Sequence, residues 1–313
     1  MRLGLDVMGG DYAPDVTIKG AILAHKLLPS DVELVLFGDE NVIRKFCIDN
    51  NSDPRDFTIV HASEVIEMGD HPAKAFSHKT QSSIFLGFKE LEAGKIDAFA
   101  SAGSTGAMMV GAMYTVKTIP GIIRPTITAA VPRMDGSFSI LLDVGINPDC
   151  KPDVLYQYAV LGSLYTEFVY NVPKPRVGLL NIGSEEEKGN LLTKATFQLM
   201  QGSKEFNFIG NVEGNDLFDF KKVDVIVCDG FVGNVLLKAA ESFYHLIRKR
   251  NIQDEFFERF NFENYGGTPV LGVNSNVIIG HGISNDIAIK NMILHTFDVT
   301  RANLPAKIKE VFK

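Results

Sequence analysis

The chain has 313 residues, enough for one large α/β domain or two modest domains with a substantial core. Its 31 basic and 38 acidic residues give a net charge of -7, which argues against a dedicated nucleic-acid-binding protein. The three cysteines are odd in number and widely spaced, so we predict neither a disulfide framework nor a Cys-x-x-Cys metal site. These properties favour a protein of the reducing cytoplasm.

The chain begins with a short apolar run and a glycine turn, so we expect no signal peptide. The uncharged segment 98–116 approaches the length of a membrane span. It contains no Leu or Ile, however, and it holds Ser101, Gly103 and Gly111, which are typical of a loop. We therefore predict a glycine loop leading into a helix here, and no transmembrane span.

Short apolar runs alternate with amphipathic segments along the whole chain, a pattern that predicts a mostly parallel, doubly wound sheet covered by helices on both faces. The predicted strands are residues 3–7, 33–37, 57–61, 98–101, 126–131, 139–144, 176–182, 206–210 and 223–228. The predicted helices are residues 14–28, 41–49, 81–93, 105–114, 152–170, 190–202, 233–249 and 284–299. Because no linker or composition shift interrupts the pattern, we predict one α/β domain over residues 1–313, with room for a smaller lobe in the middle.

Ligands of such sheets bind at the carboxyl ends of the strands, so we expect the functional residues in the loops that follow the strands. The first such loop contains Gly9 and Gly10, where the backbone can approach a ligand closely. Asp6 and Asp11 could bind a hydroxyl group, a metal or backbone NH groups. Alternatively, Asp11 caps the following helix and Asp6 accepts hydrogen bonds at the strand end.

The loop after the predicted strand 98–101 opens a helix and carries Ser104, Thr105 and Gly106. Backbone NH groups at a helix start, with small hydroxyl groups beside them, can bind an anion such as phosphate. One of the two hydroxyl residues could instead cap the helix. Neither GxGxxG nor GxxxxGK[ST] occurs, so neither a nicotinamide nor an ATP site is supported.

Three later loops each carry one chemically useful side chain beside glycine: Lys188 in the loop that contains Gly183, Asn234 after Gly233, and His281 between two glycines. The ordinary alternatives are a solvated ion pair of the lysine with the preceding glutamates and a structural role for the histidine. Together, a cation, an amide donor and an imidazole could hold an anion and polarise a carbonyl group. We expect the cap of the helix after His281 to be Ser284.

Other catalytic arrangements are missing from the sequence. GxSxG is absent, so a hydrolase nucleophile is unsupported, and Cys228 lies in an apolar strand where we expect an inert thiol. HExxH and paired metal-ligand spacings are also absent, so we predict no metal site.

A series of motifs in unbroken order carries a family resemblance. The motifs are DVMGGDYAPD (6–15), SAGSTGA (101–107), RPTI (124–127), LLDVGIN (141–147), GSEEEKGN (183–190), NVEGNDLF (211–218), CDGFVGNVLLK (228–238), YGGTPVLGVN (265–274) and IIGHGISN (278–285). The set resembles the bacterial phosphate acyltransferase family of phospholipid synthesis. The resemblance implies an α/β/α sandwich related to phosphate acetyltransferases and isocitrate dehydrogenases, usually as a homodimer.

The resemblance also implies the reaction. Orthophosphate would attack the thioester of an acyl-acyl carrier protein and give acyl phosphate, without a cofactor, and a membrane-bound acyltransferase would pass the acyl group to glycerol 3-phosphate. The family motifs place functional residues at Lys188, Asn234 and His281. We assign Lys188 to the phosphate or oxyanion charge, Asn234 to the acyl carbonyl, and His281 to proton handling or phosphate binding. The expected phosphate- and substrate-binding residues are Asp6, Gly9, Gly10, Ser104, Thr105, Gly106, Gly183 and Gly233.

One region departs from the family pattern. Family members commonly carry a long amphipathic stretch before the YGG motif, whereas here the interval 248–267 is short. Ile252, Phe256 and Phe260 could share one helix face, which would contact either a second subunit, the inner face of the membrane or the protein's own core. An acidic carrier protein needs a basic surface, for which the candidates are Arg248–Arg250, Lys117, Arg124 and Arg133.

Two alternative functions are consistent with the same sequence features. A phosphate acetyltransferase would take its acyl group from a coenzyme A thioester. A non-catalytic module would bind phosphorylated ligands or the carrier protein through the same loops and would form no acyl phosphate.

Overall fold

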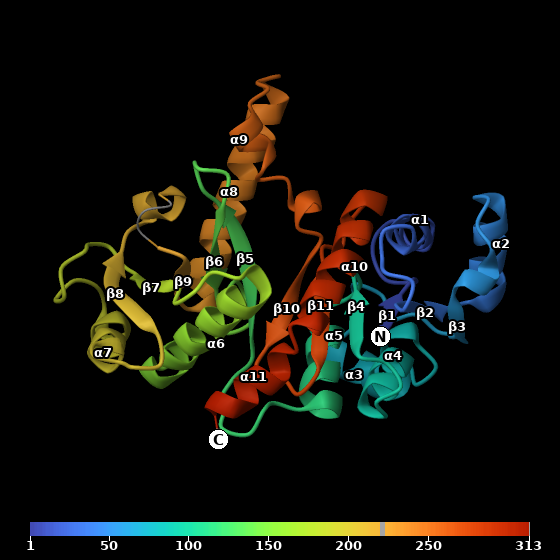
Figure 1. The fold of residues 1–313 in the computed structure, drawn as a ribbon, viewed down its shortest axis with the longest axis horizontal. Helices are drawn as coiled ribbons and strands as arrows, with labels where there is room; N and C mark the ends of the chain where they lie inside the picture. Colours follow the sequence, from blue (N-terminus) through green and yellow to red (C-terminus); the bar gives the residue numbers. More distant parts are fainter. Residues whose placement is uncertain (220–222, 313) are drawn as a thin grey trace. The chain divides into compact units, whose positions relative to one another are not determined.

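The computed structural model describes residues 1–219 and 223–312. The chain divides into two compact units (Figure 1). Unit 1 comprises Met1–Ile119 and Phe262–Pro305, and unit 2 comprises Pro120–Asn261 and Ala306–Lys313. Each unit has its own strands and helices of the expected α/β type, so the α/β prediction is confirmed.

The strands of unit 1 follow the order β3-β2-β1-β4-β11-β10. All neighbouring pairs are parallel except β10 and β11, which run antiparallel. The central strand β1 is buried from Leu3 to Asp6, as expected for a strand covered on both faces. The strands are β1 (Arg2–Asp6), β2 (Glu33–Gly38), β3 (Thr58–His61), β4 (Ala98–Ser101), β10 (Gly267–Leu271) and β11 (Asn276–Gly280).

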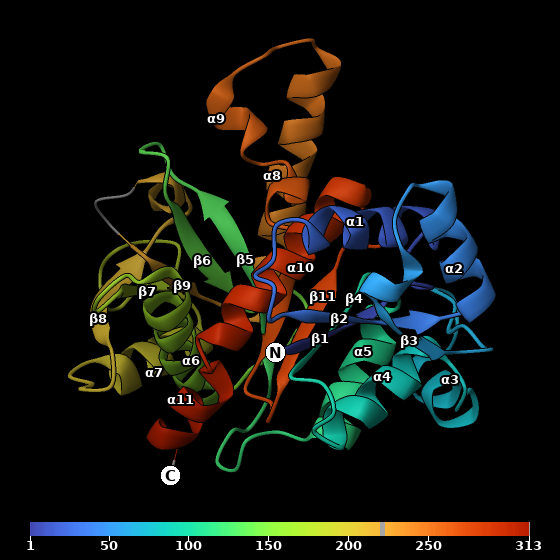
Figure 2. The same ribbon diagram turned by 45° about the vertical axis from the view of Figure 1, so that its right-hand side comes forward.

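Helices cover both faces of this sheet. Figures 1 and 2 show α1 and α10 side by side on one face and α3, α4 and α5 on the other. The rings of Phe37, Phe99 and Phe88 meet edge to face beneath the second group, with centroid distances of 5.5 and 5.3 Å. The helical segments are α1 (Asp15–His25), α2 (Glu40–Asp49), η1 (Pro54–Asp56), α3 (Pro72–His78), α4 (Ser83–Glu92), α5 (Thr105–Gly111), η2 (Ala112–Val116), η4 (Phe262–Asn264) and α10 (Asp286–Arg301).

The strands of unit 2 follow the order β5-β6-β9-β7-β8, with β6, β9, β7 and β8 parallel and β5 antiparallel to β6. Neighbouring residues of β6 point to opposite faces. Leu142 lies against Gly162 of α6, whereas Leu141 belongs to the apolar cluster that receives Leu236 and Leu237 of α8. Helices α6 and α8 therefore cover opposite faces (Figure 2). The strands are β5 (Thr126–Pro132), β6 (Phe138–Leu142), β7 (Arg176–Leu180), β8 (Asn207–Val212) and β9 (Val225–Val227), and the helical segments are α6 (Pro152–Tyr170), α7 (Leu191–Met200), η3 (Gly214–Phe218), α8 (Gly230–Lys249) and α9 (Glu255–Glu258).

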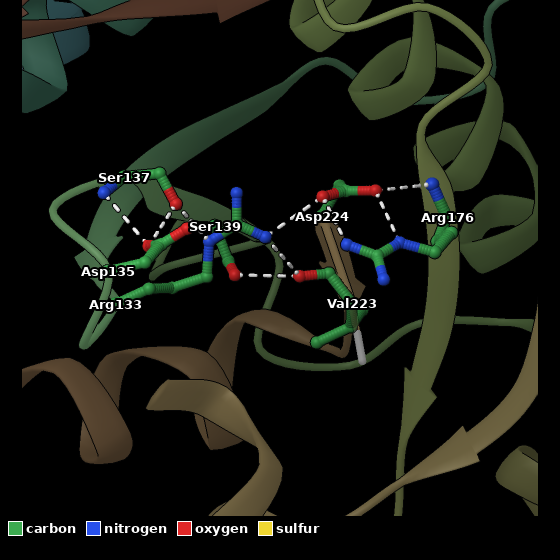
Figure 3. A network of polar contacts seen from close by, with 7 residues as sticks. All are labelled: Arg133, Asp135, Ser137, Ser139, Arg176, Val223 and Asp224. Atoms are coloured by element: carbon green, nitrogen blue, oxygen red, sulfur yellow. Dashed lines mark hydrogen bonds and ion pairs between the residues drawn. The ribbon is translucent and has the colours of Figure 1, made fainter. Parts of the chain in front are cut away.

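A buried ion-pair network lies at the amino ends of the parallel strands of unit 2 (Figure 3). Arg133 Nη1 donates to Asp224 at 2.8 Å, and Arg176 Nε donates to the other carboxylate oxygen at 2.9 Å. Burial acts to raise the pKa of Asp224, but the hydrogen bonds from Arg176 and Arg133 outweigh it and hold the pKa at about 2. Arg133 is buried in this network, so its prediction as part of a basic surface is wrong.

Every predicted strand and helix has a counterpart, but in the described part of the chain five strands and α-helices were not predicted. They are α3, α9, β10, β11 and α11 (Leu304–Val311). Strand β10 contains Pro269, which removes a donor from the ladder, and glycines surround both β10 and β11. These residues weaken the local strand signal, and pairing within the sheet supplies the stability that local propensity lacks.

The short region after α8 packs within its own unit. Helix α9 has only four residues and does not include Ile252, so the prediction of one helix face from Ile252 to Phe260 is wrong. The ring of Phe260 instead contacts Phe256 and Phe218, at centroid distances of 5.5 and 5.8 Å. This packing favours the protein's own core over an external surface for Phe256 and Phe260.

Segment 98–116 forms β4, a glycine loop, α5 and η2, as predicted. In the described part of the chain, no helix combines the length and the apolar character that crossing a membrane would require.

Candidate functional site

The loops that leave β1, β4 and β11 meet at one edge of the unit 1 sheet, because these strands are parallel. The amide of Asp11 donates to the carbonyl oxygen of Gly282 at 2.8 Å, which joins the first loop to the loop of His281. Gly10 has a φ of +115° beside this contact, a backbone conformation that favours glycine. The structure thus brings the predicted residues Gly10 and His281 into adjoining loops.

Asp6 is fully buried beneath these loops. Its carboxylate accepts hydrogen bonds from Ser101 Oγ at 2.6 Å and from the amide of Met8 at 3.0 Å. Ser101 Oγ in turn accepts a hydrogen bond from the amide of Gly103 at 2.9 Å, close to Gly9. Burial raises the pKa of Asp6, and the hydrogen bond from Ser101 opposes that rise. The strand-end acceptor alternative is therefore confirmed, and Asp6 shapes the glycine loops from below.

Ser104 is the cap of α5, and its buried hydroxyl oxygen accepts from the amide of Ala107 at 3.3 Å. Thr105, the first residue of the helix, is exposed, and Gly106 packs against the ring of Pro72. Of the two hydroxyl groups, only that of Thr105 faces solvent.

Two other predicted caps are wrong. Helix α1 begins at Asp15 after Pro14, so Asp11 does not cap it. Helix α10 is capped by Asn285, whose side-chain oxygen accepts from the amide of Ala288 at 2.9 Å. Ser284 is buried instead, and its hydroxyl has no hydrogen-bond partner among residues 1–219 and 223–312.

In unit 2, Lys188 lies in the loop after β7. A methyl group on Gly183 would lie 2.8 Å from Cγ of Lys188, so the lysine stem crosses directly over this glycine. The side-chain amide of Asn211 donates to the carbonyl oxygen of Glu185 at 2.8 Å and fastens the loop to β8. Lys188 is exposed, and within the described parts of the chain no carboxylate forms an ion pair with its ammonium group. The solvated ion pair with a neighbouring glutamate is therefore not observed.

Asn234 lies in the first turns of α8, after β9. Its Nδ2 donates to the carbonyl oxygen of Val144 at 3.3 Å, in the loop after β6. Gly145 of that loop is exposed, and a methyl group there would lie 3.0 Å from Nδ2 of Asn234. Gly233 packs directly against the backbone carbonyl of Asp143. One amide hydrogen of Asn234 thus binds the backbone, and residues 1–219 and 223–312 supply no acceptor for the other.

Strands β6, β9 and β7 are parallel, so the loops of Lys188 and Asn234 lie at the same edge of the unit 2 sheet. The sequence interpretation missed three residues that organise the two edges: Ser101, Asp143 and Asn147. One signal for Asp143 was present, because Leu142-Asp143-Val144 repeats the Leu-Asp-Val triplet at the end of β1.

The structure gives little support to thiol or metal chemistry. Burial raises the pKa of the Cys228 thiol well above its ordinary value, and burial raises the pKa of Cys150 to about 11. In the ranges 1–219 and 223–312, no group of three or more His, Cys, Asp or Glu residues could hold a metal ion.

Comparisons with known proteins identify the family and the fold. The family described as "Fatty acid synthesis protein" matches residues 1–256. Phosphate acyltransferases from Dictyoglomus turgidum and Syntrophomonas wolfei are 42% and 41% identical, covering 99% and 97% of this chain and 97% and 96% of their own. Phosphotransacetylases from Streptococcus pyogenes and Staphylococcus aureus share the fold, with TM-scores of 0.66 and 0.65 at 17% and 16% identity, over 96% of this chain and 94% of theirs. This chain therefore belongs to the phosphate acyltransferase family.

Proposed function

We propose that this protein transfers a fatty acyl group from acyl carrier protein to orthophosphate and releases acyl phosphate for phosphatidic acid synthesis. A phosphate oxygen attacks the thioester carbonyl carbon, the new C–O bond forms, and the C–S bond breaks. The proton of the phosphate ends on the released thiol, so the step needs neither oxidant nor cofactor. The observation that carries the proposal is the exposed ammonium of Lys188, without a carboxylate partner in the described chain, at the sheet edge that also holds Asn234.

Lys188 and Asn234 supply what this step requires. A cation lowers the cost of bringing a phosphate dianion against the thioester and stabilises the oxyanion that forms. The second amide hydrogen of Asn234 is donated to the acyl carbonyl oxygen, while the first stays hydrogen-bonded to the carbonyl oxygen of Val144. In unit 1, we assign His281 to proton handling or phosphate binding, and Thr105 with the neighbouring backbone amides to phosphate.

The partners follow from the same proposal. Acyl carrier protein is acidic, so it would bind exposed basic side chains, of which Lys117, Arg124 and Arg248–Arg250 remain as candidates. Acyl phosphate is reactive and carries a long apolar chain, and a membrane-bound glycerol 3-phosphate acyltransferase would consume it. We place the enzyme in the cytoplasm, where both substrates occur.

The proposal includes a homodimer, formed through α8. Phe231, Val235, Phe243 and Leu246 lie along one side of this helix and are 65%, 55%, 66% and 53% exposed. An exposed apolar face of this length is typical of a protein interface. A second copy is the occupant we assign, because the family that the motifs resemble is usually homodimeric.

Phe243→Asp is expected to convert the dimer into a monomer, since it places two buried charges in the interface. Sedimentation velocity measures the change, and Leu199→Asp, at an exposed position of α7, is the control. A variant that stays dimeric but no longer floats with anionic vesicles would assign the face to the membrane instead.

The proposed activity is tested by mixing the protein with acyl-acyl carrier protein and orthophosphate and trapping acyl phosphate with hydroxylamine. Phosphate-dependent acyl hydroxamate is the expected product. Product formed only from short acyl-coenzyme A would select a phosphate acetyltransferase, and saturable phosphate binding without product would select a non-catalytic module.

Lys188→Ala is expected to lower kcat/KM by about 100-fold or more, because it removes the cation that stabilises the transition state. The same assay measures the loss. Lys194→Ala, which removes an exposed lysine from the following helix α7, is the control and should keep wild-type turnover. Near-normal turnover by Lys188→Ala would contradict the assigned role.

A further inference from the structure

The loop after β6 is folded around the carboxylate of Asp143, which is completely buried. Oδ2 accepts from the amide of Asn147 at 2.6 Å and from the side-chain Nδ2 of the same residue at 3.2 Å. Oδ1 accepts longer contacts from the amides of Ile146 and Ile127, at 3.4 and 3.5 Å. All of these groups are donors, so the carboxylate closes residues 143–147 into a turn that only an acceptor at this position can hold.

Asn147 extends the turn to neighbouring segments. Its Nδ2 also donates to the carbonyl oxygen of Pro125 at 2.8 Å, and its own carbonyl oxygen accepts from the amide of Gly230 at 2.8 Å. Gly230 is the first residue of α8. The turn is thereby bonded to the start of the helix that carries Asn234.

The contact between the turn and α8 is close enough to orient Asn234. Gly233 lies against the carbonyl of Asp143 without room for a side chain, and Val144 presents its carbonyl oxygen to Nδ2 of Asn234. Gly145, at a φ of +131°, has no side chain to crowd the amide, since a methyl group there would lie 3.0 Å from Nδ2 of Asn234. The direction of the Asn234 amide is therefore set by the turn, and the turn is set by Asp143.

From this chain of contacts we infer that Asp143 is a positioning residue for the acyl-transfer reaction and acts through Asn234. The inference rests on the proposed function, because it assigns Asn234 to the acyl carbonyl. A hydrogen-bond donor contributes fully only when it points at the oxyanion before the reaction begins. Asp143 supplies this orientation without touching the substrate, since its carboxylate is buried and occupied.

Unit 1 contains a similar buried aspartate at the end of a strand. Asp6 follows Leu5 at the end of β1, is also fully buried, and organises its glycine loop through Ser101 and Gly103. The repeated Leu-Asp-Val triplet therefore performs the same local task at one strand end in each unit.

A double-mutant cycle tests the inference. Asp143→Asn keeps the shape but turns one acceptor into a donor that faces other donors. With Asn234 present, this variant is expected to lose about 10- to 100-fold in kcat while the KM for phosphate changes by less than about 3-fold. With Asn234→Ala, which itself loses about 100-fold, adding Asp143→Asn should cost less than about 3-fold more. Ser139→Ala, which removes a buried hydroxyl at the other end of β6, is the control and should leave kcat unchanged.

The outcomes separate the inference from the proposed function. Wild-type protein that makes no acyl phosphate overturns the proposed function and the inference with it. If the wild type is active, two results overturn the inference alone. One is that the kcat losses of Asp143→Asn and Asn234→Ala multiply in the double variant, and the other is that Asp143→Asn keeps full turnover. Should Asp143→Asn fail to fold, Asn147→Ala takes its place in the cycle, because it keeps the backbone bond to Asp143 and removes only the side-chain amide. The same non-multiplying losses are then expected, and multiplying losses overturn the inference.

Discussion

Gly233→Ala is expected to lower the free energy of unfolding by about 2–3 kcal/mol, the cost typical of overpacking, and to abolish most acyl transfer. The added methyl group would overlap the carbonyl oxygen of Asp143, which is backbone and cannot rotate away. Alanine is normally favoured over glycine within a helix, so a loss here would identify the contact as the cause. Chemical denaturation measures the stability, and hydroxylamine trapping measures the activity.

Gly214→Ala is the matched control for this substitution. Gly214 lies in η3 of the same unit, and an added methyl group would meet nothing within 4 Å. Its effect should stay within about 0.5 kcal/mol, as for most surface substitutions. Equal stability of the two variants would show that the turn after β6 can move away from α8 without cost.

Asp224→Asn is expected to destabilise the protein by about 3–5 kcal/mol, because it leaves the buried guanidinium group of Arg133 and the half-buried one of Arg176 without their carboxylate. Arg133 Nη1 and Arg176 Nε both donate to this carboxylate, whose side chain is only 8% exposed. The network lies at the amino ends of the strands (Figure 3). The loops of Lys188 and Asn234 follow the carboxyl ends of β7 and β9, at the opposite edge of the sheet. Turnover per folded molecule should therefore remain unchanged, and a large fall in kcat of the folded variant would contradict this separation.

The same carboxylate predicts a pH dependence. Its pKa is about 2 in the folded protein against an ordinary value of 3.8, so its contribution is present above about pH 4 and is lost as the pH falls toward 2. This difference amounts to about 2 kcal/mol. The stability advantage of wild type over Asp224→Asn should shrink by that amount between about pH 6 and pH 2, as measured by urea unfolding. The raised pKa of Asp6 acts in the opposite direction but is common to both proteins and cancels in the difference.

Local patterns in the sequence determined most of the architecture. Buried strands such as Ala98–Ser101 are short, mostly apolar runs. Long helices such as Pro152–Tyr170 begin at a proline and continue for many residues. The positions of both kinds of element therefore follow from neighbouring residues alone. The alternation of strands and helices predicts parallel strands, and the loops that follow parallel strands lie at one edge of the sheet. The glycine-flanked positions of Lys188, Asn234 and His281 could be selected for the same reason, although their roles remain predictions.

Only the tertiary structure decided which polar side chains face a ligand and which hold the loops in place. Arg133 looks like a surface cation in the sequence, but pairing with Asp224 removes it from the surface. Asp143 looks like any polar residue at a strand end, yet four amide donors surround its buried carboxylate. Arg133 and Asp224 lie 91 residues apart, so no local pattern records their pairing, and the amide of Ile127 reaches Asp143 from the neighbouring strand β5. The sequence by itself therefore determined where the loops at the strand ends begin, and tertiary contacts decided which of their side chains are buried and hydrogen-bonded and which stay exposed.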